Sequence, residues 1–175
     1  VQAALLSRDA YRRTAEETEA ILPALGIVVL TAMLFGLGLM NVVVEGSRTP
    51  EVSGIADRLV RMWLVVVTAL VGWVLWGLAV HLLGGKFLGG AATFRQTLRV
   101  LGICYGPGLL WLFVRVPAVG YYLHFVGLIW VLVAGIAAAH EVQRTDWAAA
   151  VLSTTFGWAL FLVLPSLLFI LPTIG

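Results

Sequence analysis

The stretch from Ile21 to Val44 limits the possible folds of this chain more than any other feature, because it contains no charged residue. A helix needs about 20 mostly apolar residues to cross the hydrocarbon of a bilayer. Inside that hydrocarbon the protein itself must satisfy every backbone N–H and C=O group, which helices do within one segment. We therefore expect this stretch to cross a membrane as an α-helix.

Four further apolar stretches are predicted to be spans, namely residues 62–83, 97–114, 121–139 and 148–171. Only 11% of the residues are charged and 61% are hydrophobic, whereas a soluble domain has about 25% charged residues. The predicted fold is therefore all-α: an integral membrane bundle of five transmembrane helices, formed by residues 21–175, with the first span at 21–44.

The third predicted span is interrupted by Gly106-Pro107-Gly108, so we expect it to be kinked. Proline lacks an N–H group and disturbs the preceding helical turn. The carbonyl groups that this frees in the membrane must be satisfied by protein or water. Two topologies stay open: five spans, or four spans with a re-entrant third segment.

Two short segments are predicted to lie along the membrane surface. Residues 1–20 form a juxtamembrane amphipathic segment, in which Arg12 and Glu16 stand at the i,i+4 spacing of a helical ion pair. Thr49-Pro50-Glu51 is typical of a helix start, and residues 52–63 continue with apolar residues at helical spacing. We expect a short interfacial helix there, leading into the second span.

The basic residues near the span ends predict the orientation of the chain. With five spans, one side collects Arg8, Arg12, Arg13, Lys86, Arg95, Arg99 and Arg144, and the other collects Arg48, Arg58, Arg61 and Arg115. Cytoplasmic loops carry the excess of Lys and Arg. We therefore expect a multi-pass protein of a plasma or inner membrane with a cytoplasmic amino terminus. The formal charge of +2 comes from these loop ends and predicts no nucleic-acid partner.

The glycine-rich stretch from Gly84 to Gly90 lacks the residue order of a phosphate-binding loop, which needs Gly-x4-Gly-Lys-Ser/Thr after a strand. We expect Gly84-Gly85 to end the second span and Thr93 to cap the next helix. The basic residues beside them, Lys86, Arg95 and Arg99, are predicted to bind lipid headgroups at the interface.

The candidate cofactor ligands are the three histidines, His81, His124 and His140. Imidazole nitrogen can bind a metal, including the iron of haem or the magnesium of chlorophyll. No second ligand at i+3 or i+4 completes a site, so hydrogen bonds to carbonyl groups or water are favoured. His124 is the strongest candidate, because an ionisable group below the interface usually has a partner. We predict no metal and no cofactor, apart from a pigment or haem if the chain belongs to an energy-transducing complex.

No catalytic pattern is found: there is no Ser/His/Asp order, no HExxH and no CxxC, so we do not predict an enzyme. Small residues carry a different signal. Helices in lipid associate where small residues let their backbones approach. Gly102, Gly106 and Pro107 of the third span are therefore predicted to be helix-packing residues.

One segment also resembles a known family. Residues 93–102 read TFRQTLRVLG, preceded by Gly84-Gly85-Lys86 and followed by Tyr105 and Pro107, and this pattern is similar to the signature of the Yip (Ypt-interacting-protein-like) domain family. The later half continues the resemblance with Gly127-Leu128-Ile129-Trp130, His140-Glu141-Val142 and Trp147-Ala148-Ala149-Ala150. It covers roughly residues 20–170. This chain departs from the family by inserting residues 87–90 and by having His140 before the glutamate.

The resemblance implies a five-span helical domain with a cytoplasmic amino terminus, in a prokaryotic member. Eukaryotic members bind small GTPases and shape or sort membranes, but a partner of that type is not expected here. Three functions stay open. The first is a non-enzymatic membrane protein that acts through helix packing with lipids or other membrane-protein subunits. The second is an accessory subunit of a larger photosynthetic or respiratory assembly. The third is a small transporter or channel around the broken third span.

Overall fold

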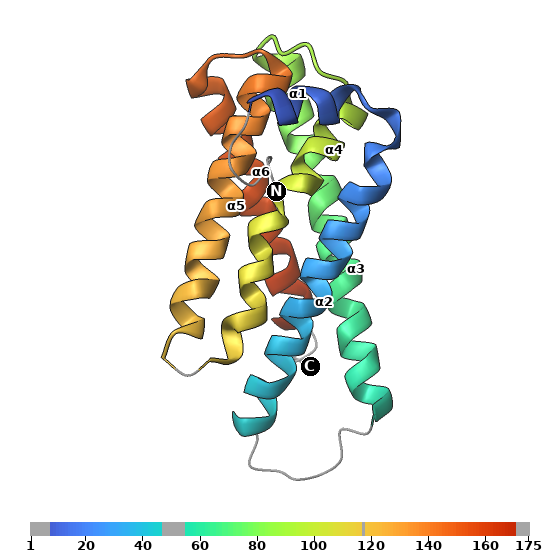
Figure 1. Cartoon of the computed structure of the whole chain (residues 1–175), viewed down its shortest axis with the longest axis vertical. Helices are drawn as coiled ribbons and strands as arrows, with labels where there is room; N and C mark the ends of the chain where they lie inside the picture. The colour runs from blue at the N-terminus through green and yellow to red at the C-terminus, as the bar shows by residue number, and fades with distance from the viewer. Residues whose placement is uncertain (1–7, 47–54, 117, 171–175) are drawn as a thin grey trace.

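The computed structural model describes residues 8–46, 55–116 and 118–170, and these are almost entirely helical (Figure 1). In chain order the elements are α1 (Arg8–Glu16), the 3-10 turn η1 (Thr18–Ala20), α2 (Ile21–Gly46), α3 (Ile55–Ala79), the π-helical η2 (Val80–Phe87), α4 (Phe94–Cys104), the 3-10 helix η3 (Gly106–Arg115), α5 (Gly120–Gln143) and α6 (Trp147–Ile170). No strand occurs in these ranges, and the all-α prediction is confirmed.

The long helices stand side by side as a bundle whose two ends differ (Figure 1). One end, which we name the α1 end, holds α1, the η2–α4 connection and the α5–α6 connection. The opposite end holds the turn between η3 and α5. The short helix α1 lies across the bundle and not along it, so it covers the α1 end.

Three helical segments in the described part of the chain are long and apolar enough to cross a membrane. They are Thr18–Leu37, Met62–Phe87 and Gly120–Gln143, with mean hydropathies of 2.4, 2.2 and 2.0. Trp147–Val163 is a shorter apolar helix. The chain is therefore a membrane protein, whereas the count of five spans stays a prediction.

The third predicted span consists of two helical segments of different pitch, α4 and η3. The α-helix ends at Cys104, and Pro107 lies in the first turn of η3, where a missing N–H group is tolerated. The N–H of Gly108 donates to the carbonyl of Tyr105 at 2.7 Å, a 3-10 hydrogen bond. The interruption predicted at Gly106-Pro107-Gly108 is thus present, and the local 3-10 turn satisfies the carbonyl of Tyr105.

The two predicted surface segments are only partly covered by the structure. Residues 1–7 and 47–54 lie outside the described residues, so the start of each segment is not assessed. The described part of the first segment forms α1 and η1. From Ile55 onward the predicted interfacial helix is continuous with α3.

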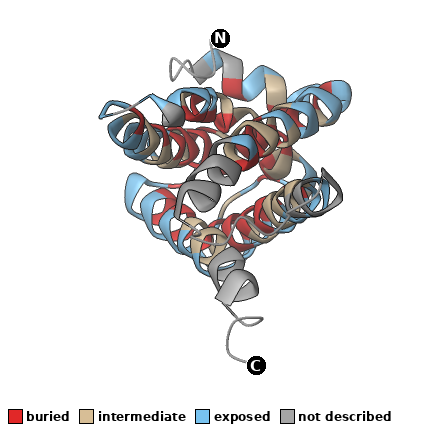
Figure 2. Ribbon diagram, turned by 90° about the horizontal axis from the view of Figure 1, so that it is seen from below, coloured by how far each residue is buried: buried red, intermediate tan, exposed pale blue. Residues whose placement is uncertain are grey.

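The interior of the bundle is built around aromatic side chains that make hydrogen bonds. Trp76 is fully buried, and its indole N–H donates to the carbonyl of Thr154 at 3.0 Å. Trp73 donates in the same way to the carbonyl of Leu98 at 3.0 Å. Buried residues face inward and exposed ones line the outside of the bundle (Figure 2). Many exposed residues are large and apolar, as expected where lipid is the solvent.

Glycines allow the helices to approach this core. A Cβ atom on Gly135 would lie 2.6 Å from Cζ2 of Trp76, and one on Gly157 would lie 2.6 Å from its Cδ1. Between α4 and α2, a Cβ on Gly102 would lie 2.7 Å from the Cβ of Ala24. Real Cβ atoms essentially never come this close, so α4 meets α2 at a distance that only glycine permits at position 102.

We predict that Gly102→Ala destabilises the protein by about 1–3 kcal/mol, because overpacking forces helix shifts of this cost. The matched control is Gly26→Ala on α2, since an added Cβ there meets nothing within 4 Å. Unfolding of both variants in one detergent gives the measurement. Equal stability of the two variants would contradict the packing role of Gly102.

Candidate functional site at the α1 end

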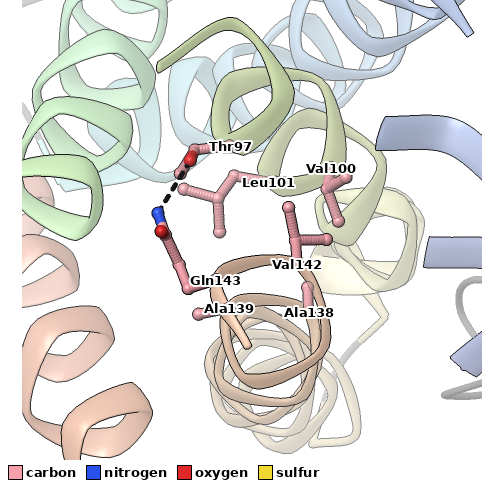
Figure 3. Close-up of a pocket in the computed structure, with 7 residues that line it drawn as sticks. All are labelled: Thr97, Val100, Leu101, Ala138, Ala139, Val142 and Gln143. Carbon is pink, nitrogen blue, oxygen red and sulfur yellow. Dashed lines mark hydrogen bonds between the residues drawn. The ribbon is translucent and has the colours of Figure 1, made fainter. Parts of the chain in front are cut away.

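Gln143, the last residue of α5, connects three segments of the α1 end. Its side chain is 1% exposed. The backbone carbonyl accepts a hydrogen bond from the N–H of Ala91 at 2.9 Å, and Oε1 accepts one from the N–H of Ala92 at 3.3 Å. Nε2 donates to Oγ1 of Thr97 at 3.0 Å (Figure 3). One amide side chain therefore holds α5, the η2–α4 connection and α4 together.

The pocket drawn in Figure 3 lies between α4 and α5 and is a packed seam. It is lined by Thr97, Val100, Leu101, Ala138, Ala139, Val142 and Gln143. This seam joins the two helices.

The glycine-rich stretch has a structural explanation in this end of the bundle. Gly84 and Gly85 do not stop the second span, as the sequence suggested, because the helix widens into the π-helical η2 and ends at Phe87. A Cβ on Gly84 would lie 3.2 Å from Oγ of Ser153 on α6. The absence of side chains at these positions lets the wide turn pack against α6 and Gln143.

Gly90 then folds the chain back onto the same turn. Its N–H donates to the carbonyl of Gly84 at 2.9 Å. A Cβ on Gly90 would lie 2.5 Å from Oε1 of Gln143. Gly89, beside it, has φ +78°, which favours glycine. The connection is thus a loop held in one conformation by its own contacts. Any larger residue at position 90 would displace Gln143.

The prediction that Thr93 caps α4 is confirmed. Its Oγ1 accepts the N–H of Gln96 at 3.4 Å, and Oε1 of Gln96 accepts the N–H of Thr93 at 2.8 Å. These reciprocal bonds form a capping box. The start of α4 is therefore held locally as well as through Gln143.

The helix α1 is bound to α4 and α5 by apolar and polar contacts. Tyr11 and Ala15 are buried in one cluster with Val100, Cys104, Ala134 and Ala138. Burial, together with nearby Cys104, raises the pKa of the Tyr11 phenol well above its ordinary value. Arg12 pairs with Glu141 of α5 at 3.1 Å.

The three predicted headgroup residues lie in two different environments. Lys86 and Arg95 are exposed. Arg99 is 8% exposed and donates from a terminal guanidinium nitrogen to the carbonyl of Ala15 at 3.1 Å. Arg99 therefore connects α4 to α1 in this structure. For all three residues the headgroup contact stays a prediction.

The structure does not bring the three candidate histidines together. His124, in the first turns of α5, stacks on Phe35 with ring centroids 5.4 Å apart. His140 stacks on Trp147 at 4.0 Å, and His81 lies beside Phe94 at 6.0 Å, both at the α1 end. Within the described ranges no three His, Cys, Asp or Glu residues form a group that could hold a metal ion.

Sequence reasoning missed Gln143, although a signal for it was present. It is an uncharged polar residue at the end of an apolar helix, and Arg144 after it has φ 54°, a left-handed conformation that ends the helix. The sequence could not show which groups bond to Gln143, because Ala91, Ala92 and Thr97 come from another part of the chain.

The resemblance seen in the sequence is supported by comparison with known proteins. A family model described as the Yip1 domain matches residues 4–168. This chain belongs to the Yip1 domain family. No curated protein and no solved structure matches the chain. Gln143 and the η2–α4 connection of the α1 end both fall inside the matched range.

We predict that Gln143→Leu destabilises this Yip1 domain by about 1–3 kcal/mol for each buried polar group left unpaired. The Ala92 N–H loses its Gln143 partner in this variant, whereas Thr97 Oγ1 keeps its hydrogen bond to the carbonyl of Thr93. Hydrogen exchange at Ala92, whose N–H binds the lost side-chain oxygen, should accelerate along with the loss of stability. The control is Thr155→Leu, a similar polar-to-apolar change at an exposed position of α6. Unchanged exchange in Gln143→Leu would contradict the role of Gln143.

Proposed function

We propose that this Yip1 domain protein is a non-enzymatic, multi-pass membrane protein that acts through contacts of its α1 end with lipids and protein partners. The observation that carries the proposal is the attachment of α1 across α4 and α5. Tyr11 and Ala15 are buried there, and Arg99 donates to the carbonyl of Ala15. A helix held in this way presents its opposite face in a defined position.

The exposed face of the α1 end is rich in charge, while the sides of the bundle are apolar. Exposed charged residues at this end are Asp9, Arg12, Arg13, Glu16, Glu17, Glu19, Lys86, Arg95, Arg144 and Asp146. Mixed charges on a fixed surface favour specific association, because complementary potentials steer a partner and exclude others. The proposed role needs contact surfaces and no reaction centre, and the α1 end supplies such a surface.

The charge distribution also supports an orientation with the α1 end in the cytoplasm of a prokaryotic plasma or inner membrane. Arg12, Arg13, Lys86, Arg95 and Arg144 belong to elements that meet at this end (Figure 1). The Lys and Arg excess marks the cytoplasmic side.

Cysteine labelling tests the orientation. In a Cys104→Ala background, which removes the one native cysteine, an impermeant maleimide applied to spheroplasts should label Val119→Cys and leave Arg13→Cys unlabelled. Arg13→Cys should react once the membrane is permeabilised. Position 119 lies in the turn at the opposite end and is 50% exposed. The reverse pattern would place the α1 end outside.

Co-purification in mild detergent tests the partner role. We expect a membrane-protein partner to be retained by the wild-type chain and lost by Arg13→Glu/Glu16→Lys, which changes the exposed face of α1 and leaves Tyr11 and Ala15 in place. Val119→Glu, at the opposite end, is the control and should keep the partner. A wild-type chain that purifies with lipid alone would contradict a stable protein partner.

The purified protein also distinguishes the two alternative functions, an accessory subunit and a transporter. A complex of fixed stoichiometry with several other membrane proteins would assign the chain as an accessory subunit. Solute flux in proteoliposomes that disappears in Pro107→Ala would assign a transporter built around the η3 break.

A further inference from the structure

The tip of the η2–α4 connection carries the most exposed large apolar side chain among the described residues. Phe87 is 73% exposed, and Leu88 beside it is 40% exposed. Phe87 is also the last residue of Met62–Phe87, a segment long and apolar enough to span a membrane. The two side chains therefore emerge where a span ends, at the level of the lipid headgroups.

The backbone behind this tip is already satisfied by the protein. The N–H of Leu88 donates to the carbonyl of Leu83 at 3.0 Å, and the N–H of Gly90 donates to that of Gly84 at 2.9 Å. The N–H groups of Ala91 and Ala92 bind Gln143. A loop with internally bonded polar groups can enter a region of low polarity at small cost, whereas unpaired groups would resist it.

Two exposed cations flank the apolar tip in sequence. Lys86 immediately precedes Phe87, and Arg95 lies in the first turn of α4. Neither has an ion-pair partner within the described ranges. Apolar side chains bordered by Lys and Arg are typical of elements that enter the headgroup region of anionic membranes. The combination matches a lipid with an acidic headgroup and apolar tails.

We infer that the η2–α4 connection is a binding element for anionic phospholipid, with Phe87 and Leu88 inserted at the interface and Lys86 and Arg95 on the headgroup phosphate. Gln143 and Gly90 set the position of the tip, because they fix the base of the loop. The inference deepens the proposed function, since it assigns one lipid class to one part of the α1 end.

Lipid binding by the purified full chain tests the proposed contacts of Lys86 and Arg95 with the headgroup phosphate. In mixed micelles of phosphatidylglycerol and phosphatidylcholine, native mass spectrometry should show preferential retention of phosphatidylglycerol. Lys86→Gln or Arg95→Gln should each weaken this about five-fold, and the double variant about thirty-fold, from the usual contribution of a basic residue near an anionic surface. Arg13→Gln removes an exposed cation from α1 and should leave binding unchanged.

Two results would overturn the assignment. The first is equal retention of both lipids by the wild-type chain. The second is a loss of phosphatidylglycerol retention in Arg13→Gln that equals the loss in Lys86→Gln or Arg95→Gln, which would show that only the net charge of the protein matters. Raising the salt should weaken phosphatidylglycerol retention in the wild type, because exposed charges are screened.

Fluorescence tests the insertion of Phe87. A nitrobenzoxadiazole probe is attached to Phe87→Cys or to Ala91→Cys, both in the Cys104→Ala background, in phosphatidylglycerol vesicles. Ala91 is exposed in the same connection, so it is the matched control. Lipids brominated near the headgroup should quench the probe at 87 more than the probe at 91. Equal or reversed quenching would contradict insertion of the tip.

The lipid-binding experiments and the co-purification experiment can fail independently of each other. Loss of the protein partner in Arg13→Glu/Glu16→Lys with intact phosphatidylglycerol retention would show that partner and lipid use different residues. Retained partner binding in Lys86→Gln/Arg95→Gln, without a lipid preference in the wild type, would reject the lipid site and leave the proposed function standing.

Discussion

Close approach of helices at glycine is the constraint on which the structure depends. Lipid tails are as apolar as leucine, so burying apolar surface does not drive helices together inside a membrane, and tight packing must do so. Trp76 shows how this is achieved: Gly135 and Gly157 leave room for its ring, and the carbonyl of Thr154 accepts its indole N–H. The bundle thereby satisfies a buried donor and fills the space between three helices with one side chain.

The α1 end is stabilised differently, by polar groups that are buried against one another. Gln143 bonds to the η2–α4 connection and to Thr97, and Arg99 bonds to the backbone of α1 at Ala15. Buried polar groups in a network specify one arrangement, because each loses heavily if its partner moves. This difference explains how an apolar bundle can present a charged face of fixed shape, which is the property that a membrane protein acting through contacts requires.

Membership of the Yip1 domain family agrees with this division of the molecule. The matched range, residues 4–168, includes α1 as well as the long helices. The helix α1, which lies across the end of the bundle, therefore belongs to the domain. The packed seam between α4 and α5 joins the spans, while the exposed loop tip at Phe87 and the outer face of α1 meet the surroundings. The side chains exposed at the loop tip and on the outer face of α1 are therefore different from those that hold the fold together.

Features that depend on neighbouring residues were determined by the sequence alone. The lengths of the apolar runs, the capping box at Thr93 and the break at Pro107 follow from local chemistry, and so does the all-helical class. Only the tertiary structure decided the rest. Arg99 is buried because Ala15 lies against it from 84 positions away, and Gly84 and Gly85 continue a helix because Ser153 and Gln143 pack on them. Contacts between distant segments override local preference, because the residues that make them are far apart in the sequence and a local pattern does not contain them.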